Sequence, residues 1–281
     1  MKFYELISKG AKKLKLCCIQ NSSLDSEILL CHVLNITREE MILNLNKKAN
    51  RKQITNFNKM IIERLKKKPI AYLINKKNFW KTQFYVNKSV LIPRPDSEIL
   101  VSSSVKLISK NDKLKILDIG TGTGCIIISI LLERKNCTGI AIDISKSAIN
   151  IAKTNAKMQQ LENRIRFFNS DIDNFFFGKY DFIVSNPPYI KRCKLRYLDE
   201  DVKNFEPYIA LDGGLNGITS IEKVIKKSKN LLKLKGKFVL EIDHSQVEDI
   251  KSLLMKNNFY INQVCKDLNC KYRCIISTKI Q

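Results

Sequence analysis

Asn186-Pro187-Pro188-Tyr189 follows an apolar run, residues 180–185, that has the pattern of a buried strand. The two prolines lack a backbone N–H and fix φ, and Pro187 also favours an extended Asn186. The loop therefore offers carbonyl acceptors with few competing donors. We expect it to bind a planar NH2 group, with the Asn186 side-chain carbonyl and the Pro187 main-chain carbonyl accepting its two N–H bonds and Tyr189 stacking over its plane.

A glycine-rich turn, Gly120-Thr121-Gly122-Thr123-Gly124, follows a predicted strand at 114–119 and precedes a predicted helix. Without a Cβ, glycine lets the backbone approach a ligand closely. Asp143 ends the next predicted strand, where its carboxylate can accept hydrogen bonds from two ribose hydroxyls. The combination indicates a cofactor that carries ribose.

The spacing of the glycines distinguishes between cofactors. A dinucleotide fingerprint is Gly-x-Gly-x-x-Gly, but here the third glycine comes one residue early, and the lysine of a phosphate-binding loop is missing. With Asp118 ahead of the turn and Asp143 after it, the pattern resembles the S-adenosylmethionine site of a class I methyltransferase. We expect residues 120–124, Asp143 and Asn186 to bind this cofactor. Asp171, after a third strand, either borders the adenine or lies in an ordinary surface turn.

Methyl transfer to an amide or a ring-attached amine requires orientation, because the nitrogen lone pair is delocalised. For an amide the conjugation is large, as the rotation barrier of roughly 18–20 kcal/mol shows. Holding two reactants in line contributes ~7–11 kcal/mol, whereas a desolvated hydrogen bond contributes ~1–3 kcal/mol. We therefore expect in-line positioning to dominate the chemistry, with Asn186 and Pro187 steering it and no general base required.

Alternating strand and helix patterns position both segments. Strands are predicted at 114–119, 138–143, 164–169, 180–185, 236–242, 259–265 and 272–278, and helices at 95–109, 124–135, 145–158, 219–233 and 245–257. This alternation predicts an α/β fold with a seven-stranded, Rossmann-like, mainly parallel sheet, helices on both faces and an antiparallel hairpin at one edge. The glycine turn, Asp143 and Asn186 then all follow carboxyl ends of strands and share one cleft.

Ahead of this sheet, apolar residues recur at helical spacing. We expect a small helical bundle at 1–68, a connector with a β-hairpin at 69–93 and the methyltransferase domain at 94–281. Asp25 and Thr37 stand where helix N-caps are expected, and Glu40 would complete a capping box with Thr37.

The composition of this 281-residue chain, with 44% hydrophobic residues, predicts a globular protein. The formal net charge of +23 is concentrated near the N-terminus, where residues 1–80 hold 17 Lys/Arg against 6 Asp/Glu. This excess indicates either attraction to RNA, ribosomes or an acidic protein, or simply a lysine-rich composition. Nine scattered cysteines without a Cys-x-x-Cys pair, and only two histidines, predict reduced thiols and no metal site. No signal peptide or membrane span is apparent, so we expect a cytoplasmic protein with no membrane partner.

Three further segments carry a resemblance that covers nearly the whole chain. They are Leu91-Ile92-Pro93-Arg94-Pro95-Asp96-Ser97-Glu98, residues 205–217 after the tetrapeptide, and residues 25–34 in the bundle. With the motifs above, they resemble the protein-(glutamine-N5) methyltransferases of class-1 peptide-chain release factors, the PrmC or HemK family. The resemblance implies S-adenosylmethionine as methyl donor, the glutamine of the release factor's Gly-Gly-Gln motif as acceptor, a role in translation termination, and a bundle that grips the release factor.

Other functions fit parts of this pattern. A related glutamine methyltransferase of a ribosomal protein shares Asn-Pro-Pro-Tyr but lacks the Pro-Arg-Pro-Asp found here at residues 93–96. An adenine-N6 methyltransferase on DNA or RNA would use the same tetrapeptide, and a charge of +23 suits nucleic acid. Residues 1–68 contain no recognisable nucleic-acid module, so we do not expect nucleic-acid binding as the main function. A non-enzymatic RNA-binding protein would not need the intact cofactor and tetrapeptide motifs.

Four positions depart from the family pattern, and they bear on loop geometry and cofactor affinity. They are Lys68, Asn75, Ile172 and Asp243.

Overall fold

The computed structural model describes residues 1–267 and 269–281. It divides into two compact units, the first comprising Met1–Lys76 with Asp199–Phe205 and the second Lys77–Leu198 with Glu206–Gln281. The domain boundaries predicted after residues 68 and 93 remain predictions. Among the described residues, no helix has both the length and the apolar content needed to cross a membrane.

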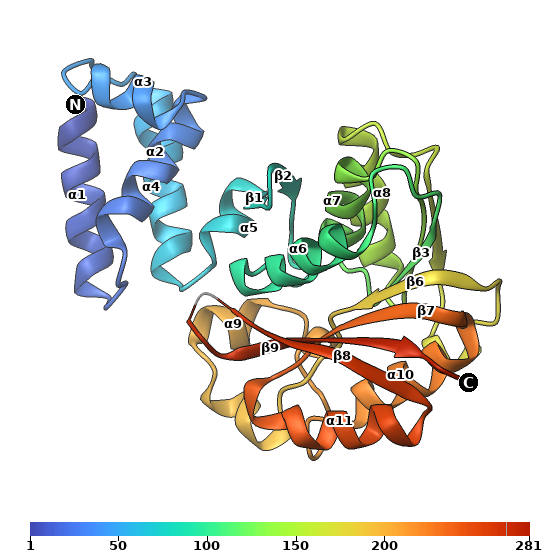
Figure 1. Ribbon diagram of the computed structural model, residues 1–281. Helices are drawn as coiled ribbons and strands as arrows, with labels where there is room; N and C mark the ends of the chain where they lie inside the picture. Colours follow the sequence, from blue (N-terminus) through green and yellow to red (C-terminus); the bar gives the residue numbers. More distant parts are fainter. Residues whose placement is uncertain (268) are drawn as a thin grey trace. The chain divides into compact units, whose positions relative to one another are not determined.

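The first unit is helical (Figure 1). Its helices are α1 (Phe3–Leu16), α2 (Ser22–Leu34), α3 (Arg38–Leu43), α4 (Arg51–Leu65), α5 (Ile70–Ile74) and α9 (Glu200–Phe205). The apolar positions that recur at helical spacing, among them Leu14, Leu29 and Phe57, are buried together in its core.

The two N-caps predicted in this unit have different outcomes. Thr37 Oγ1 accepts a hydrogen bond from Glu40 N at 3.2 Å and Glu40 Oε2 accepts one from Thr37 N at 2.8 Å, so the capping box is confirmed. The prediction for Asp25 is wrong, because Asp25 lies inside α2 and the N-cap is Asn21. The buried carboxylate of Asp25 instead pairs with Arg64 Nε of α4 at 2.8 Å and joins the two helices.

The second unit contains a seven-stranded sheet in the order β5-β4-β3-β6-β7-β9-β8. Its strands are β3 (Lys115–Ile119), β4 (Thr138–Asp143), β5 (Ile165–Asn169), β6 (Tyr180–Ser185), β7 (Leu232–Glu241), β8 (Phe259–Lys266) and β9 (Tyr272–Lys279). The first five in this order are parallel neighbours, whereas β9 is antiparallel to β7 and β8. The predicted fold class and edge hairpin are confirmed. A separate hairpin pairs β1 (Lys76–Phe79) with β2 (Thr82–Tyr85).

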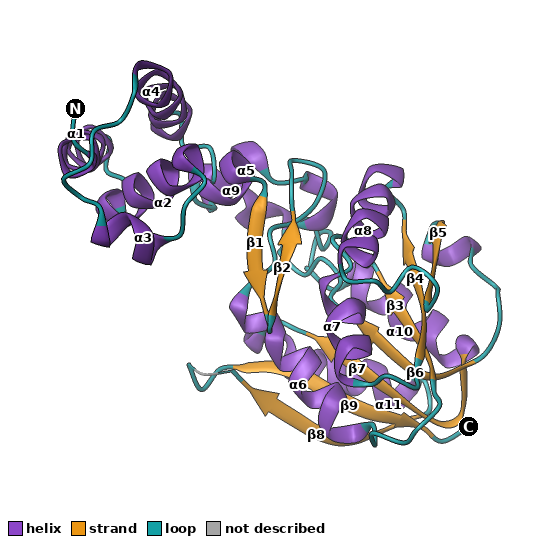
Figure 2. Ribbon diagram, turned by 90° about the horizontal axis from the view of Figure 1, so that it is seen from above, coloured by secondary structure: helices purple, strands orange, loops and turns teal. Residues whose placement is uncertain are grey.

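Helices cover both faces of the sheet (Figures 1 and 2). One face carries α6 (Glu98–Leu107), α7 (Cys125–Glu133) and α8 (Lys146–Met158). The other carries α10 (Thr219–Leu231) and α11 (Val247–Lys256). Each face has its own buried cluster, as expected for strands that are apolar on both sides.

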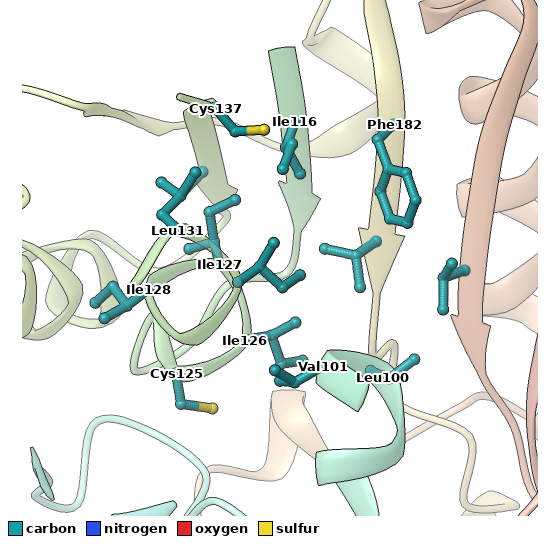
Figure 3. Packing of buried hydrophobic residues seen from close by; sticks show 14 of the residues in the cluster. Leu100, Val101, Ile116, Cys125, Ile126, Ile127, Ile128, Leu131, Cys137 and Phe182 are labelled. Atoms are coloured by element: carbon teal, nitrogen blue, oxygen red, sulfur yellow. The ribbon is translucent and has the colours of Figure 1, made fainter. Parts of the chain in front are cut away.

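The packing of α6 and α7 fixes the element that follows the glycine turn. Figure 3 shows Val101 of α6 with Ile126 and Ile127 of α7 against the sheet face that carries Ile116 and Phe182. All of these side chains are buried. The start of α7 is therefore held by the core on one side and by the turn on the other.

The order of the strands determines where a ligand can bind. From β3 the chain continues through β4 and β5 on one side of the sheet, and then returns to add β6 on the other side of β3. The loops that follow the carboxyl ends of β3 and β6 therefore run in opposite directions and leave a crevice between them. Such a crevice is the usual ligand site of an open parallel sheet.

Candidate active site

A cavity of about 540 Å³ lies at this edge of the sheet, within the second unit. Its lining comes from the ends of four parallel strands, the first turns of α7 and α8, the segment before α6, the loop before α10 and the first turns of α10. These contributing segments are 89–97, 119–126, 142–148, 170–172, 185–188, 207–212 and 220–224. We call the part around residues 120–123 and Asp143 the cofactor end, and the part around residues 186–188 and Ser97 the acceptor end.

The glycine turn supplies an open cradle at the cofactor end. Gly120 and Gly122 have φ values of +74° and +54°, and a Cβ built on either would meet no atom within 4 Å. Both line the cavity, as do Thr121 and Thr123. The N–H groups of Gly120 and Thr121 both donate to Ile142 O, at 2.9 and 3.0 Å, so the turn is fastened to β4. A ligand can therefore lie directly against the backbone.

Gly124 was expected to bind cofactor, and the structure gives it a packing role. Its φ is +79°, and an added Cβ would lie 2.9 Å from Ile128 and 3.3 Å from Ala152. It is not among the described residues that line the cavity. The third glycine thus permits close packing between α7 and α8, and its contact with a cofactor remains a prediction.

Two aspartates accept hydrogen bonds from residues of the glycine turn. Asp118 is fully buried, and its Oδ2 accepts a hydrogen bond from Thr121 Oγ1 at 2.7 Å. Burial raises the pKa of Asp118 to about 7. Asp143 Oδ2 accepts from Gly122 N at 2.8 Å and Oδ1 accepts from Ser145 N at 2.9 Å. Burial raises the pKa of Asp143, and these two hydrogen bonds counteract that rise.

Asp143 fits the ribose role in its position. Its carboxylate lines the cavity, and each oxygen can accept a second hydrogen bond besides the one from the backbone. Asp171 also lines the cavity, but its Oδ1 accepts from Asp173 N at 2.9 Å and caps the turn that follows. Asp171 is therefore a local cap that also borders the cavity, and its place beside an adenine remains a prediction. The cradle and the Asp143 carboxylate fit a ribose-bearing methyl donor.

The tetrapeptide follows β6, and its first three residues line the cavity. Asn186 Nδ2 donates a hydrogen bond to Ser97 Oγ at 3.1 Å. Because the two ends of a side-chain amide point apart, Asn186 Oδ1 is directed away from Ser97. Ser185, just before, donates from Oγ to Ile119 O at 2.8 Å and ties the ends of β6 and β3 together. The acceptor end is thus adjacent to the cofactor end.

Tyr189 is placed differently from the stacking role that we predicted. It is not among the described residues that line the cavity, and its ring packs against the cluster on the α10 face of the sheet. Its hydroxyl donates to Glu241 Oε1 at 3.3 Å, and burial raises its pKa. A contact distant in sequence accompanies this placement: Gln246 Nε2 donates to Tyr189 O at 3.1 Å and fixes the backbone where the ring turns inward.

Several residues that shape the acceptor end were not identified as site residues from the sequence. Arg94 lines the cavity and pairs with Glu206, a buried carboxylate whose Oε2 also accepts from Ile92 N at 3.1 Å. Ser97 contacts Asn186 directly. Arg94, Ser97 and Glu206 fall inside segments 91–98 and 205–217, and the similarity of those segments to a family was the only available signal.

The segment that follows the tetrapeptide is hydrogen-bonded to the loop before α10. Ile190 N donates to Leu211 O at 3.3 Å and Gly213 N donates to Ile190 O at 2.9 Å. Tyr208 and Ile209, from the same loop, line the cavity and are 58% and 54% exposed. These two side chains form an exposed, apolar part of the rim of the cavity.

Comparisons with known proteins agree with this geometry. Residues 110–279 match the family model described as a methyltransferase domain, and residues 5–74 match the one described as the PrmC N-terminal domain. The methyltransferase from Pyrococcus furiosus has a similar structure, with a TM-score of 0.55 and 18% sequence identity over 81% of this chain and 100% of that one. At this identity the structural likeness shows the fold alone.

Two relatives at higher identity cover almost the whole chain. The release factor glutamine methyltransferase of Buchnera aphidicola is 37% identical over 92% of this chain and 92% of its own length. The bifunctional methyltransferase of Rickettsia felis is also 37% identical, over 98% of this chain but only 58% of its own length. The chain therefore spans little more than half of this second relative.

Proposed function

Since the chain belongs to the family of release factor glutamine methyltransferases, we propose that it methylates the side-chain amide nitrogen of a glutamine in class-1 peptide-chain release factors. The methyl donor is S-adenosylmethionine, and the acceptor is the glutamine of the Gly-Gly-Gln motif. The observation that carries the proposal is the cavity in which a glycine cradle with Asp143 adjoins Asn186 and Pro187. The activity supports translation termination and places the protein in the cytoplasm.

At the cofactor end, the backbone and one carboxylate do the binding. Residues 120–123 form the cradle. Asp143 would accept hydrogen bonds from the ribose hydroxyls of the cofactor, and Asp171 and Ile172 would border its adenine. Asn186 lies between this end and the acceptor. When bound, S-adenosylmethionine supplies an electrophilic methyl group on its sulfonium.

At the acceptor end, the chain orients the glutamine amide. Asn186 Oδ1 and Pro187 O accept its two N–H bonds, which turns the nitrogen lone pair toward the cofactor end. Each hydrogen bond contributes ~1–3 kcal/mol, and the in-line arrangement that they maintain contributes ~7–11 kcal/mol. The apolar walls of the cavity exclude water from the amide, and the extra proton leaves to solvent after transfer.

The release factor is the proposed partner. The exposed Tyr208 and Ile209 at the rim suit a loop of another protein that inserts its glutamine. The helical first unit, which matches the PrmC N-terminal domain, is proposed to grip the rest of the release factor.

A direct assay separates the proposal from its rivals. The protein is incubated with methyl-labelled S-adenosylmethionine and, in parallel, a class-1 release factor, its Gln-to-Ala variant in the Gly-Gly-Gln motif, ribosomal proteins, or duplex DNA. We expect label only in the unaltered release factor. Label that persists in the Gln-to-Ala variant, or that appears in ribosomal protein or DNA alone, would overturn the proposal.

A further inference from the structure

A buried polar network lies behind the acceptor end. Ser97, which is 3% exposed, accepts a hydrogen bond from Asn186 Nδ2 at 3.1 Å. Behind it lies Glu241, at the end of β7 and 2% exposed, which accepts a hydrogen bond from Tyr189 at 3.3 Å. The methyl-transfer scheme above uses Asn186 but gives no role to Ser97 or Glu241.

Ser97 lies beside the Glu241 carboxylate, whose Oε1 accepts the hydrogen bond from Tyr189. Burial raises the pKa of Glu241 to about 7, and the proximity of Ser97, Arg273 and Tyr189 counteracts that rise. Glu241 Oε2 is buried and has no hydrogen-bond partner among the described residues. A buried carboxylate oxygen in this state strongly favours a neighbouring hydroxyl as donor.

The direction of these contacts follows from the donor inventory. An ionised carboxylate only accepts, and a serine hydroxyl has one hydrogen. When Ser97 donates that hydrogen to Glu241, it can only accept from Asn186, so the Nδ2 end of the amide must face Ser97. The Oδ1 end is then left facing the acceptor. The two flips of the Asn186 side chain differ only in exchanging Nδ2 and Oδ1. Hydrogen bonding to Ser97 therefore selects one flip.

We propose that Ser97 is a positioning residue, anchored by Glu241, that fixes the flip of the Asn186 side-chain amide so that Oδ1 is presented to the NH2 group of the substrate. This inference rests on the proposed function for its effect on catalysis, but the orientation itself is a property of the protein alone. The wrong flip would present Nδ2 to the substrate NH2 group, and two donors repel each other.

The network has a defined dependence on pH. Protonated Glu241 can donate to Ser97, which frees the Ser97 hydrogen to bond Asn186 Oδ1 and stabilises the wrong flip. As pH rises through about 7, Glu241 ionises and the productive flip becomes the only favourable one. The titratable and charged groups that face Glu241 are Asp96 before α6, Cys125 at the start of α7, Tyr189 after β6, and Arg273 and Cys274 on β9. Arg273 favours the ionised form and Asp96 opposes it, while burial dominates both.

The orientation can be measured without any substrate. In the 15N-labelled protein, the side-chain NH2 signals of Asn186 are assigned by their loss in Asn186→Ala. We expect these signals to titrate with a midpoint near pH 7 in the wild type, and to lose that titration in both Ser97→Ala and Glu241→Gln. Ser228→Ala is the matched control, because Ser228 is a buried serine whose hydroxyl has no partner among the described residues. It should titrate as the wild type does.

Steady-state kinetics then measure the consequence. We expect Ser97→Ala to lower kcat about 10-fold, the loss for an unpaired buried donor, with the Kd for S-adenosylmethionine changed less than about threefold. Ser97→Thr keeps the hydroxyl and should restore kcat to within about threefold, and the rise of kcat with pH seen in the wild type should be absent from Ser97→Ala.

The two arms keep the inference separate from the proposed function. A wild type that labels no release factor refutes the function, and the Asn186 signals still decide the orientation. An Asn186 titration that is absent from the wild type or unchanged in Ser97→Ala overturns the inference, as does a Ser97→Ala enzyme with the wild-type kcat and pH profile.

Discussion

The two ends of the cavity are built in different ways. At the cofactor end, one continuous turn after β3 forms the cradle, and Asp143 at the end of the adjacent strand holds it. At the acceptor end, Asn186 depends on Ser97, which lies 89 residues away in the sequence. The cofactor end is therefore mainly backbone, and the acceptor end is mainly a network of side chains.

This difference separates affinity from chemistry. A backbone cradle can recognise a cofactor through its shape and a few fixed acceptors. Substitutions at the cofactor end should therefore weaken cofactor binding. A side-chain network determines the direction in which one amide points, so damage there should lower the rate once both substrates are bound. The following variants test that separation in order of expected effect.

Asn186→Ala should have the largest effect. It removes the acceptor that orients the substrate nitrogen, and we expect kcat to fall about 10³-fold, the upper range for the loss of one oriented catalytic hydrogen bond. Binding of S-adenosylmethionine, followed by calorimetry, should change far less. Asn257→Ala, at the end of α11, is the control and should keep normal turnover. Near-normal kcat in Asn186→Ala would remove Asn186 from the acceptor site.

Asp143→Ala should act on the other end. The variant loses the ribose acceptor and the bond from Gly122 N, so we expect the Kd for S-adenosylmethionine to rise about 100-fold, equivalent to two hydrogen bonds at ~1.4 kcal/mol each. At saturating cofactor, kcat should recover. Asp181→Ala, which removes a carboxylate that pairs with Lys233 near the start of β6, should leave the Kd unchanged. Equal affinity in Asp143→Ala and wild type would contradict the ribose role.

Gly122→Ala should have a smaller effect on the same end. Its methyl group would project into the cavity, and its left-handed φ of +54° costs about 1–2 kcal/mol for a residue with a Cβ. We expect the Kd for S-adenosylmethionine to rise about 10-fold. Gly178→Ala has similar backbone strain, at φ +81°, but lies outside the cavity lining, so it should lower stability without changing the Kd. If the two variants bind cofactor equally well, the cradle is not in contact with it.

Tyr189→Leu should affect the reaction least. The ring packs against the buried cluster on the α10 face, so we expect the free energy of unfolding in urea to fall by about 1–3 kcal/mol while the KM for the release factor stays within about threefold. Tyr260→Leu, at an exposed position on β8, should change neither quantity. A large rise in KM with unchanged stability would instead support the stacking role of Tyr189 that the sequence predicts.

The sequence predicts the cofactor end better than the acceptor end, for a physical reason. Strand periodicity and a glycine turn are local signals, so β3, the turn and Asp143 could be placed relative to one another before the structure was known. Gly124 shows the limit of such signals, because spacing alone cannot distinguish a glycine that allows packing against Ala152 from one that contacts a ligand.

The acceptor end depends on contacts that carry no local signal. Glu206 lies 112 residues from Arg94, and nothing in the apolar pattern indicates that its carboxylate is buried or which cation it meets. The same holds in the helical unit for Asp25, whose position near a helix start suggested a cap but whose partner is Arg64. The direction of the Tyr189 ring was likewise decided by Gln246 and Glu241, which follow much later in the chain.

The central claim is that this cavity places a methyl group on a glutamine side-chain nitrogen. Fragment-ion mass spectrometry of a release factor that the protein has methylated locates the group to one residue and one atom type. We predict a single methyl group on the side-chain amide nitrogen of the glutamine in the Gly-Gly-Gln motif. A methyl group on any other residue, or on a carboxylate or backbone nitrogen, would contradict the account.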